Sequence, residues 1–323
     1  MSDRPVVVVT RRIPVPVEED LSLRYDARLN REDRALSPAE LQAALRTADG
    51  LLCTVTDRLT ADVLSAEPLR TRILANFGVG YNNIDIEAAR ARGLRVSNTP
   101  DVLTDDTADL AITLLLMIAR RAGEGERQVR AGAWTGWRPT HLLGTRVRGK
   151  TLGLVGMGRI ARAVAQRARQ GLGMRLIFFD PYVTAADAAA LGAEARDSLE
   201  ALLEEADFVS LHCPATPETR HLINSVRLAR MKPSAFLVNT ARGDVVDEAA
   251  LAAALGAGTI AGAALDVYEQ EPRVTPALLE MENVVLLPHL GSATRETREA
   301  MGRRAVENLD RFFAGEPLRD AVV

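Results

Sequence analysis

The sequence contains few cysteines, few aromatic residues and no excess of basic charge. Only Cys53 and Cys213 occur among 323 residues, too few for a disulfide framework, and we expect a protein of the reducing cytoplasm. Lysine and arginine total 40 against 43 aspartates and glutamates, and this balance does not indicate a nucleic-acid or membrane partner. Apolar runs such as residues 114–119 are too short to span a bilayer. The run Val6–Val9 is too short for the core of a signal peptide.

Hydrophobic residues make up 47% of the chain, which is enough to bury a sizeable core, and the length suggests two domains. Short apolar stretches alternate with helical patterns, the rhythm of βαβ units and of mostly parallel sheets. The candidate strands of the first hundred residues are Val6–Thr10, Gly50–Cys53, Ile73–Asn76 and Arg95–Ser97. A second series comprises Thr151–Val155, Arg175–Phe179, Phe208–Leu211, Phe236–Asn239, Ala263–Leu265 and Val284–Leu287.

Three other segments determine the expected domain organisation. Residues 104–121 form a helical pattern that is apolar on most sides, whereas 123–149 have weak periodicity and predict an extended arm or loop. A last amphipathic helix, Thr294–Phe313, follows the final strand and would return the chain to the first domain. The predicted fold class is α/β with two doubly wound parallel sheets. A Rossmann nucleotide domain (99–291, with a dimerisation arm at about 100–150) is inserted into a flavodoxin-like substrate domain (1–98 plus 292–323).

Residues with useful chemistry follow the strands of the second series. In parallel sheets, ligands bind beyond the carboxyl ends of the strands, so these residues should meet at one edge. They are Gly156-Met157-Gly158, Asp180, His212-Cys213-Pro214, Thr240-Ala241-Arg242, Asp266 and His289. A glycine-rich turn, two acids, an arginine and a histidine at one edge are typical of a nucleotide-dependent enzyme.

The segment from Gly153 to Ala161 contains the pattern G-x-G-x-x-A between a predicted strand and a predicted helix. Gly156 permits a tight turn, and Gly158 lets the backbone approach a pyrophosphate at the helix start. Asp180 follows the next strand, where a carboxylate accepts hydrogen bonds from ribose hydroxyls and repels a 2′-phosphate. These features predict NAD as cofactor. Arg159 and Arg175 could weaken this preference, so NADPH remains an alternative cofactor.

Two side chains suit the reduction of a carbonyl group. Arg242 presents a charged planar fork to a carboxylate and a carbonyl oxygen, and His289 can exchange a proton near neutral pH. A carboxylate beside the imidazole would hold its orientation, and Glu269 and Glu271 are both candidates. An arginine at a strand end is also typical of a surface ion pair, and a single histidine of a packed core. The shared strand edge favours catalysis.

The remaining candidates are less specific. Packing roles suit His141, His212 and His221 better, with His212 also a candidate for the adenine pocket. In the first domain, the turn from Asn76 to Tyr81 contains two glycines and either forms a nest of N–H groups for a substrate carboxylate or is an ordinary turn.

The sequence resembles the D-isomer-specific 2-hydroxyacid dehydrogenases over essentially its whole length. The matching motifs include Gly78–Asp85, Asn98–Asp101, Gly153–Ala161, Asn239–Gly243, Gly262–Val267, Glu271-Pro272 and Pro288–Ser292. The resemblance implies that Arg242, Glu271 and His289 are catalytic, because the family's glutamate directly precedes a proline. It implies substrate contacts at Val79 and Gly80. It implies cofactor contacts at Thr107, Gly156, Gly158, Arg159, Ile160, Asp180, Cys213, Pro214, Thr219, Thr240, Ala241, Asp266 and Gly291.

Within that family the sequence is most similar to the glyoxylate/hydroxypyruvate reductases, as residues 134–139 and 142–144 indicate. This implies NAD(P)H-dependent reduction of a small 2-oxo acid to the D-2-hydroxy acid by a homodimer, with no metal. Trp134 and Trp137 would reach the partner subunit's active site, or would only pack the dimer arm. Many members of this subgroup use NADPH, which Asp180 puts in doubt. Alternatives are a D-3-phosphoglycerate dehydrogenase, a 2-ketogluconate-type reductase and an NAD-sensing regulator without turnover.

Overall fold

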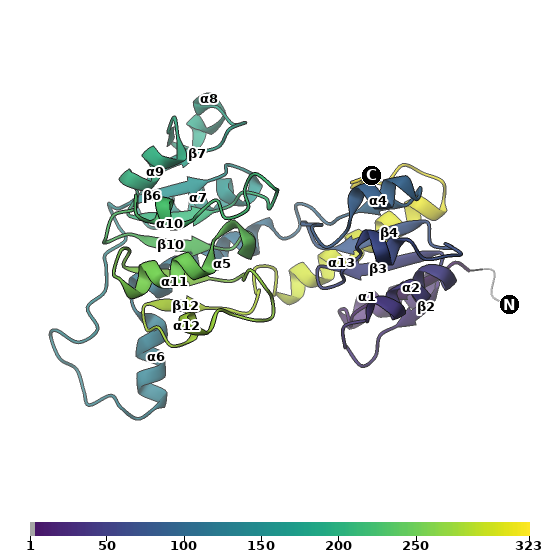
Figure 1. Cartoon of the computed structure of the whole chain (residues 1–323), viewed down its shortest axis with the longest axis horizontal. Coiled ribbons are helices and arrows are strands. Elements are labelled where there is room, and N and C mark those ends of the chain that lie inside the picture. Colours follow the sequence, from purple (N-terminus) through teal and green to yellow (C-terminus); the bar gives the residue numbers. More distant parts are fainter. Residues whose placement is uncertain (1–3) are drawn as a thin grey trace. The chain divides into compact units, whose positions relative to one another are not determined.

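The computed structural model describes residues 4–323, and these form two compact units (Figure 1). One unit contains the chain up to Leu103 together with Ala293–Val323, and the other is Thr104–Ser292. The sequence pattern places these boundaries after residues 98 and 291. Each unit is built around its own parallel sheet with helices on both faces, so the predicted α/β fold class is confirmed.

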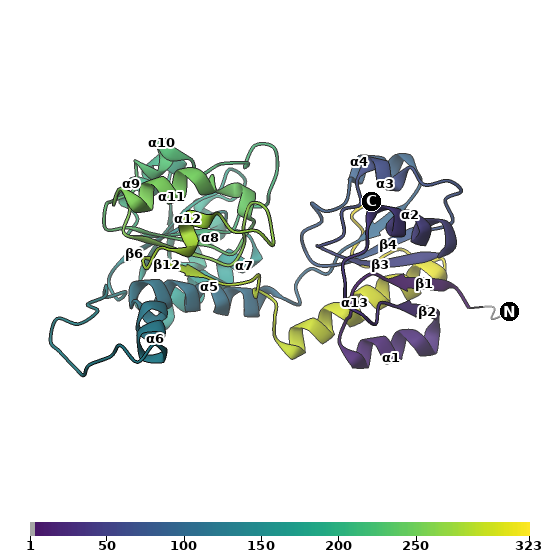
Figure 2. The same ribbon diagram turned by 60° about the horizontal axis from the view of Figure 1, so that its bottom comes forward.

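The discontinuous unit has a five-stranded sheet in the order β2-β1-β3-β4-β5, with every pair parallel. This is the flavodoxin-like order. Helices α1 and α13 pack together on one face, and α2, α3 and α4 lie on the other (Figure 2). The strands are β1 (Val6–Val9), β2 (Asp26–Leu29), β3 (Gly50–Thr54), β4 (Ile73–Phe77) and β5 (Arg95–Ser97). The helices are α1 (Val15–Arg24), α2 (Pro38–Thr47), α3 (Ala61–Leu64), α4 (Ile86–Ala91) and α13 (Arg295–Phe313).

The continuous unit has a seven-stranded parallel sheet in the order β12-β11-β10-β9-β6-β7-β8. The strand order reverses between β6 and β9, as in the Rossmann fold. The strands are β6 (Thr151–Val155), β7 (Arg175–Phe179), β8 (Ala193–Ala195), β9 (Phe208–Leu211), β10 (Phe236–Asn239), β11 (Gly262–Leu265) and β12 (Val284–Leu286). The helices are α5 (Thr104–Ala119), α6 (Ala122–Arg130), α7 (Arg159–Gln170), α8 (Ala185–Ala188), α9 (Leu199–Glu205), α10 (Ser225–Leu228), α11 (Glu248–Gly256) and α12 (Pro276–Leu279).

Alternation along the central strands gives this unit two cores. In β9, Val209 faces a cluster with Leu202 and Leu251, while Phe208 faces a cluster with Leu114 on the opposite side. Successive side chains of a strand point to opposite faces, and strands covered on both faces are apolar throughout. This explains why the strands carrying the candidate site residues were recognisable as short apolar runs.

The predicted extended arm is wrong in its first part, because residues 122–130 form the helix α6. Its two glycines, Gly123 and Gly125, weaken the helical pattern in the sequence. Charged pairs three or four residues apart, Arg121–Glu124 and Glu126–Arg130, support the helix instead. The rest of the segment up to β6 contains no further helix or strand.

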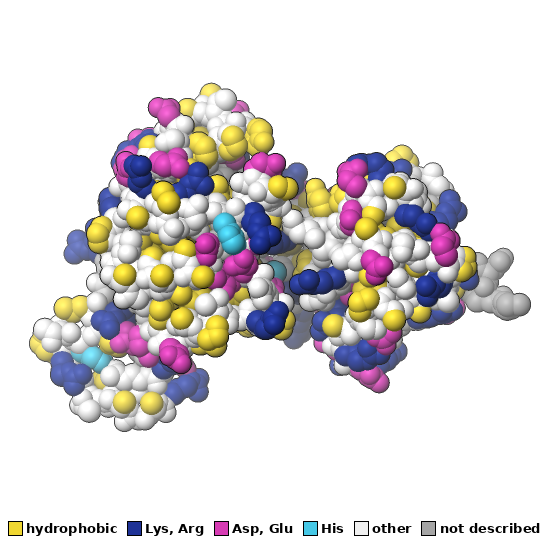
Figure 3. Space-filling view, viewed as in Figure 1, with side chains coloured by type: hydrophobic (Ala, Val, Ile, Leu, Met, Phe, Trp, Pro, Cys, Tyr) yellow, Lys and Arg dark blue, Asp and Glu magenta, His cyan; other side chains and the backbone are white. Residues whose placement is uncertain are grey.

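The surface is electrostatically mixed. Acidic and basic side chains are interspersed over the face shown in Figure 3, in keeping with the small net charge. Within residues 4–323, no helix is long and apolar enough to cross a bilayer. The same residues contain no group of three His, Cys, Asp or Glu side chains arranged to hold a metal ion.

The N-terminal cap of α2 can be tested by substitution. The hydroxyl of Ser37 accepts a hydrogen bond from the N–H of Glu40 (3.3 Å), and the Glu40 carboxylate accepts one from the N–H of Ser37 (2.9 Å). We expect Ser37→Ala to lower the free energy of unfolding of this unit by about 1 kcal/mol, because the hydroxyl that accepts from the Glu40 N–H is lost. Urea denaturation followed by circular dichroism measures this. Ser37→Thr, which keeps the hydroxyl, should lose less, and equal losses would contradict the capping role.

Candidate active site

The turn between β6 and α7 has the geometry of a phosphate-binding loop. Gly156 has φ of 88°, a left-handed conformation that favours glycine. A Cβ at Gly158 would meet no heavy atom within 4 Å, and Gly158 offers no side chain to cap α7. Ala161 is fully buried, as close packing of helix and strand requires. The start of α7 therefore presents backbone to open space, as an incoming pyrophosphate needs.

This turn lies against the loop that follows β9, which identifies the point where the strand order reverses. A Cβ on Gly156 would come within 3.0 Å of the backbone of His212 and Cys213. Beyond Cys213, the hydroxyl of Thr219 donates to the carbonyl of Pro214 (2.7 Å) and accepts from the N–H of Thr216 (2.8 Å). The predicted contacts Cys213, Pro214 and Thr219 thus belong to one braced loop. Burial raises the pKa of the Cys213 thiol to about 11, so it is neutral near pH 7.

Asp180 lies at the end of β7 and faces the same turn. Its carboxylate accepts hydrogen bonds from the N–H groups of Met157 and Tyr182, each at 2.8 Å. A carboxylate has about four lone-pair sites, so acceptor capacity remains for ribose hydroxyls. Arg175, by contrast, is the first residue of β7, at the opposite edge, and pairs with Glu194 and Glu205. The expectation that Arg175 bears on cofactor choice is therefore wrong, because the strand separates it from the binding edge.

The loop after β10 carries Thr240, Ala241 and Arg242. The side chain of Asn239 brackets this loop, because its amide donates to the Arg242 carbonyl (2.9 Å) and its oxygen accepts from the Ala241 N–H (3.0 Å). The Thr240 hydroxyl is buried and has no hydrogen-bond partner within residues 4–323. Arg242 forms no ion pair within those residues, which argues against the alternative that it serves in a surface ion pair. Burial lowers the pKa of Arg242 and the carboxylates of Glu271 and Asp244 oppose this, but an arginine remains charged.

His289 and Glu271 form a hydrogen-bonded pair. The imidazole Nδ1 lies 2.9 Å from Glu271 Oε2, while Glu271 Oε1 accepts from the N–H of Tyr268 (3.1 Å). Burial alone would raise the pKa of Glu271. The hydrogen bond and charge of His289, the Tyr268 N–H and the charge of Arg242 together lower it below its usual value. An ionised carboxylate only accepts hydrogen bonds, so Nδ1 carries the proton and Nε2 is left for other chemistry.

The backbone around His289 is held from β11. The carbonyl of Asp266 accepts from the His289 N–H (2.8 Å), and its carboxylate accepts from the N–H groups of Leu290 (2.6 Å) and Gly291 (2.8 Å). The Gly291 carbonyl in turn accepts from the Thr107 hydroxyl on α5 (3.0 Å). His289 has φ of 56°, unusual for a non-glycine residue, and such strain persists where the surroundings fix it.

The structure distinguishes the two candidate glutamates. Glu269 Oε1 lies 2.6 Å from Nε2 of His221, not next to His289. The N–H of Glu269 donates to the buried carboxylate of Glu248, which also accepts from the Thr275 hydroxyl (2.6 Å). Sequence reasoning did not identify Glu248 or Asn239 as supports of these loops. Asn239 could have been found, because it directly precedes the motif residues Thr240–Arg242. No comparable signal was available for Glu248.

The predicted substrate-binding residues belong to other segments of the chain. Val79 and Gly80 belong to the discontinuous unit, in the turn after β4, where neither Gly78 nor Gly80 has positive φ. That turn therefore lacks the alternating backbone of a nest. Trp134 and Trp137 are exposed, at 53% and 82% of their surface, in the segment after α6.

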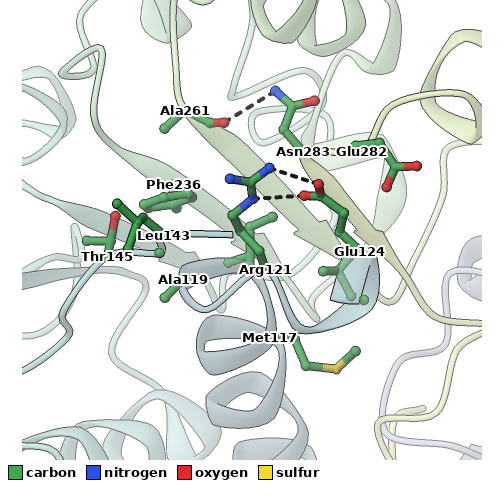
Figure 4. Close-up of a pocket in the computed structure, with 14 residues that line it drawn as sticks. Met117, Ala119, Arg121, Glu124, Leu143, Thr145, Phe236, Ala261, Glu282 and Asn283 are labelled. Atoms are coloured by element: carbon green, nitrogen blue, oxygen red, sulfur yellow. Dashed lines mark hydrogen bonds and ion pairs between the residues drawn. The ribbon is translucent and has the colours of Figure 1, made fainter. Parts of the chain in front are cut away.

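The base of that segment lies at the opposite edge of the seven-stranded sheet. A cavity of about 260 Å³ is lined there by Leu143, Thr145 and Phe236 at the start of β10, with Ala261 and Asn283 just before β11 and β12 (Figure 4). The Thr145 N–H donates to the carbonyl of Ala119 (2.7 Å). Within one chain, the segment that carries the tryptophans thus returns at Leu143 and Thr145 to the amino ends of the strands, at the edge opposite to Arg242 and His289.

The residues at the carboxyl edge fit a dinucleotide. A cofactor there would meet the open space at Gly158 and the uncapped start of α7. It would also supply a partner to the buried, unsatisfied hydroxyl of Thr240.

Known proteins share this architecture. The chain matches the model of the D-isomer specific 2-hydroxyacid dehydrogenase NAD binding domain over residues 112–291. It is 48% identical over 317 residues to a glyoxylate reductase of Thermococcus kodakarensis, covering 97% of this chain and 94% of that protein.

Solved structures agree. The NADPH-dependent glyoxylate/hydroxypyruvate reductase of Sinorhizobium meliloti, in complex with NADP and malonate, is 37% identical with a TM-score of 0.88, covering 99% of this chain and 97% of that chain. The holo form of Rhodotorula graminis D-mandelate dehydrogenase is 32% identical with a TM-score of 0.87, covering 99% and 98%. The chain belongs to the family of D-isomer specific 2-hydroxyacid dehydrogenases, and it is an oxidoreductase that uses a nicotinamide cofactor.

Proposed function

We propose that the protein reduces a small 2-oxo acid, glyoxylate or hydroxypyruvate, to the D-2-hydroxy acid with NADH. The observation that carries the proposal is the pair His289–Glu271 at 2.9 Å, next to the charged group of Arg242 and in the unit that carries the dinucleotide turn. The names of relatives that are 44–48% identical over nearly the whole chain support the small substrate.

The unit of residues 104–292 binds the nucleotide in this proposal, and the other unit binds the substrate. When bound, the reduced nicotinamide supplies the hydride that adds to C2 of the oxo acid. The protein's part is to hold the acid, to polarise its carbonyl and to deliver one proton, so that oxo acid, NADH and a proton give hydroxy acid and NAD⁺.

Arg242 polarises the carbonyl oxygen and binds the substrate carboxylate, together with the N–H groups of Val79 and Gly80. Its guanidinium is charged at all working pH values, and burial strengthens its interaction with developing negative charge. His289 donates its Nε2 proton to that oxygen. Glu271 holds Nδ1 and thereby fixes the orientation of the ring.

The proposed assembly is a homodimer formed through residues 100–150. Support comes from the exposed Trp134, Trp137 and Leu143 in that segment, since aromatic side chains are enriched at interfaces. Trp134 and Trp137 would reach the partner subunit's site or pack the arm. Both cysteines are free, in keeping with the expected cytoplasmic setting.

Removing the proton donor tests the mechanism. His289→Ala should lower kcat for reduction by about 10²–10⁴-fold, the usual contribution of a positioned general acid. Arg242→Ala should also raise KM, because the guanidinium holds the bound acid before reaction. The measurement is NADH oxidation with glyoxylate, hydroxypyruvate and longer 2-oxo acids.

Glu269→Gln is the matched control for Glu271→Gln. Only the Glu271 change should impair turnover strongly, because Glu269 pairs with His221 instead. Wild-type kcat in His289→Ala would sink the assignment. A wild-type protein that binds NADH but oxidises it with no 2-oxo acid would favour the NAD-sensing regulator, and activity with 3-phosphoglycerate would favour the phosphoglycerate alternative.

Asp180 should set the preference for NADH over NADPH. Asp180→Ser keeps an acceptor but removes the charge, so the ratio of kcat/KM for NADH to that for NADPH should fall about tenfold or more, in proportion to one lost charge-assisted hydrogen bond. Thermal denaturation of the variant checks that the fold survives loss of the Met157 and Tyr182 contacts. An unchanged ratio would remove Asp180 from this role.

His212 should not contribute to the pH dependence of activity. Burial lowers the pKa of His212 from 6.5 to about 4, so the imidazole is neutral across neutral and alkaline pH. Between those values the unfolded chain binds more protons than the folded one, so His212 makes stability fall as pH drops from 6.5 towards 4.

The test compares the wild type with His212→Gln. The substitution should flatten the loss of stability over that acidic range and leave the neutral part of the kcat/KM profile unmoved. A histidine NMR signal that disappears in the variant and titrates near neutral pH in the wild type would contradict the prediction.

A further inference from the structure

Glu271 lies in the segment Glu269–Thr275, and the middle of this segment has little packing to hold it. Residues 270–273 are all exposed, whereas Tyr268 just before the segment is buried. A loop with few buried contacts opens easily on its own. A carboxylate on such a loop stays within hydrogen-bond distance of His289 only if contacts at the ends of the segment fix its backbone.

Both ends of the segment bind the same buried side chain, that of Glu248. Glu248 Oε1 accepts a hydrogen bond from the N–H of Glu269. Its Oε2 accepts from the hydroxyl of Thr275 (2.6 Å) and from the N–H of the same residue (3.3 Å). Glu248 is 4% exposed, so water competes little for these bonds. One carboxylate therefore joins the two ends of the exposed loop that carries Glu271.

The Glu248 carboxylate also ties this loop to the chain that follows Arg242. Glu248 is the first residue of α11, shortly after Arg242. Gly243 lies directly against the held segment, because a Cβ there would overlap the carbonyl group of Tyr268. The Tyr268 hydroxyl in turn donates to the carbonyl of Leu287, just beyond β12 (2.8 Å). The loop is thus fixed against the chain segments that carry the proposed carbonyl-binding arginine and the proposed proton donor.

We propose that Glu248 is a positioning residue that holds the carboxylate of Glu271 at the imidazole of His289. The inference rests on the proposed function and deepens it, because it names the contact that keeps the general acid oriented. Glu248 touches no reactant and acts through Glu271. Its loss should leave the imidazole poorly oriented, while the sites for the oxo acid and the nucleotide remain.

Glu248→Ala tests the proposal by removing the acceptor at both ends of the segment. The kcat for glyoxylate should fall about tenfold or more, since a small displacement of a catalytic group is enough for such a loss. The Kd of NADH, and that of oxalate on the NADH complex, should stay near their wild-type values in calorimetry. Glu248→Gln, which keeps the size and one acceptor oxygen, should recover part of kcat.

The double variant Glu248→Ala/Glu271→Gln separates positioning from general support of the fold. Residues that act as a unit have non-additive effects. If Glu248 acts through Glu271, the double variant should be hardly slower than Glu271→Gln alone. Two independent effects would multiply in kcat, and that outcome would overturn the proposal.

NMR spectroscopy of the histidine side chains gives a readout that needs neither cofactor nor turnover. The chain has only four histidines, and His289→Gln assigns the signals of His289. In its neutral form, wild-type His289 should carry the proton on Nδ1, as the hydrogen bond to Glu271 selects. Glu248→Ala should lose this preference. The ring of His212, which is hydrogen-bonded to Ser210 (2.9 Å), should keep its signals and report an intact fold.

Asp207→Ala is the matched control. The Asp207 carboxylate likewise accepts from a backbone N–H of the same unit, that of Thr151 (2.9 Å), and binds Lys232 (3.0 Å), but at the opposite edge of the sheet. This variant should leave kcat and the signals of His289 unchanged. An equal loss of kcat in Asp207→Ala would overturn the proposal, by showing a general effect on the unit.

Thr275→Val keeps the test decisive if Glu248→Ala fails to fold. It removes one bond to Glu248, that of the hydroxyl, and should give the same pattern with a smaller amplitude. A folded Glu248→Ala, or failing that Thr275→Val, with wild-type kcat and wild-type His289 signals would overturn the positioning role. Signals of His289 that depend on Glu248 in a protein that reduces no 2-oxo acid would support the inference while refuting the proposed function.

Discussion

The candidate active site depends on one residue more than on any other, Asp266 at the end of β11. Its carbonyl and carboxylate accept three successive N–H groups, those of His289, Leu290 and Gly291. These bonds hold His289 in a left-handed conformation that an unsupported histidine would rarely adopt. Burial raises the pKa of Asp266, and the two N–H donors to its carboxylate act against that rise. The strand order alone does not place the imidazole next to Glu271. The hydrogen bonds from Asp266 fix the backbone that does so.

The two units prepare their loops by opposite means. In the nucleotide unit, an acceptor side chain binds backbone N–H groups, and the imidazole of the clamped segment is left available. In the other unit, the donor amides of Asn76 and Asn98 bind backbone carbonyls, and N–H groups are left available. A buried polar group that is fully hydrogen-bonded makes a loop rigid at little cost, whereas an unsatisfied one is expensive. These loops at strand ends are thus made rigid by hydrogen bonds to one kind of backbone group, the N–H groups in one unit and the carbonyls in the other.

The sequence was most informative where burial and strand ends coincide. Apolar runs predicted the strands covered on both faces, and the residues just beyond them include Asp180, Arg242, Asp266 and His289. Edge strands such as β2 and β8 were missed because their alternating or short polar sequences lack that signal. Residues alone left Glu269 and Glu271 open, and the choice between them came from resemblance. The structure shows the physical basis of that choice, because the carboxylate of Glu269 is hydrogen-bonded to His221.

Cofactor preference should depend on a single side chain and not on the fold. The Sinorhizobium meliloti reductase adopts this architecture with NADP bound, at 37% identity. In the present chain, Asp180 is held at the end of β7 by two backbone N–H groups, so its carboxylate cannot easily turn away. A 2′-phosphate placed at this position would face a fixed negative charge, and like charges in a partly buried site repel strongly. Ribose hydroxyls would instead meet an acceptor already oriented towards the turn that receives the pyrophosphate.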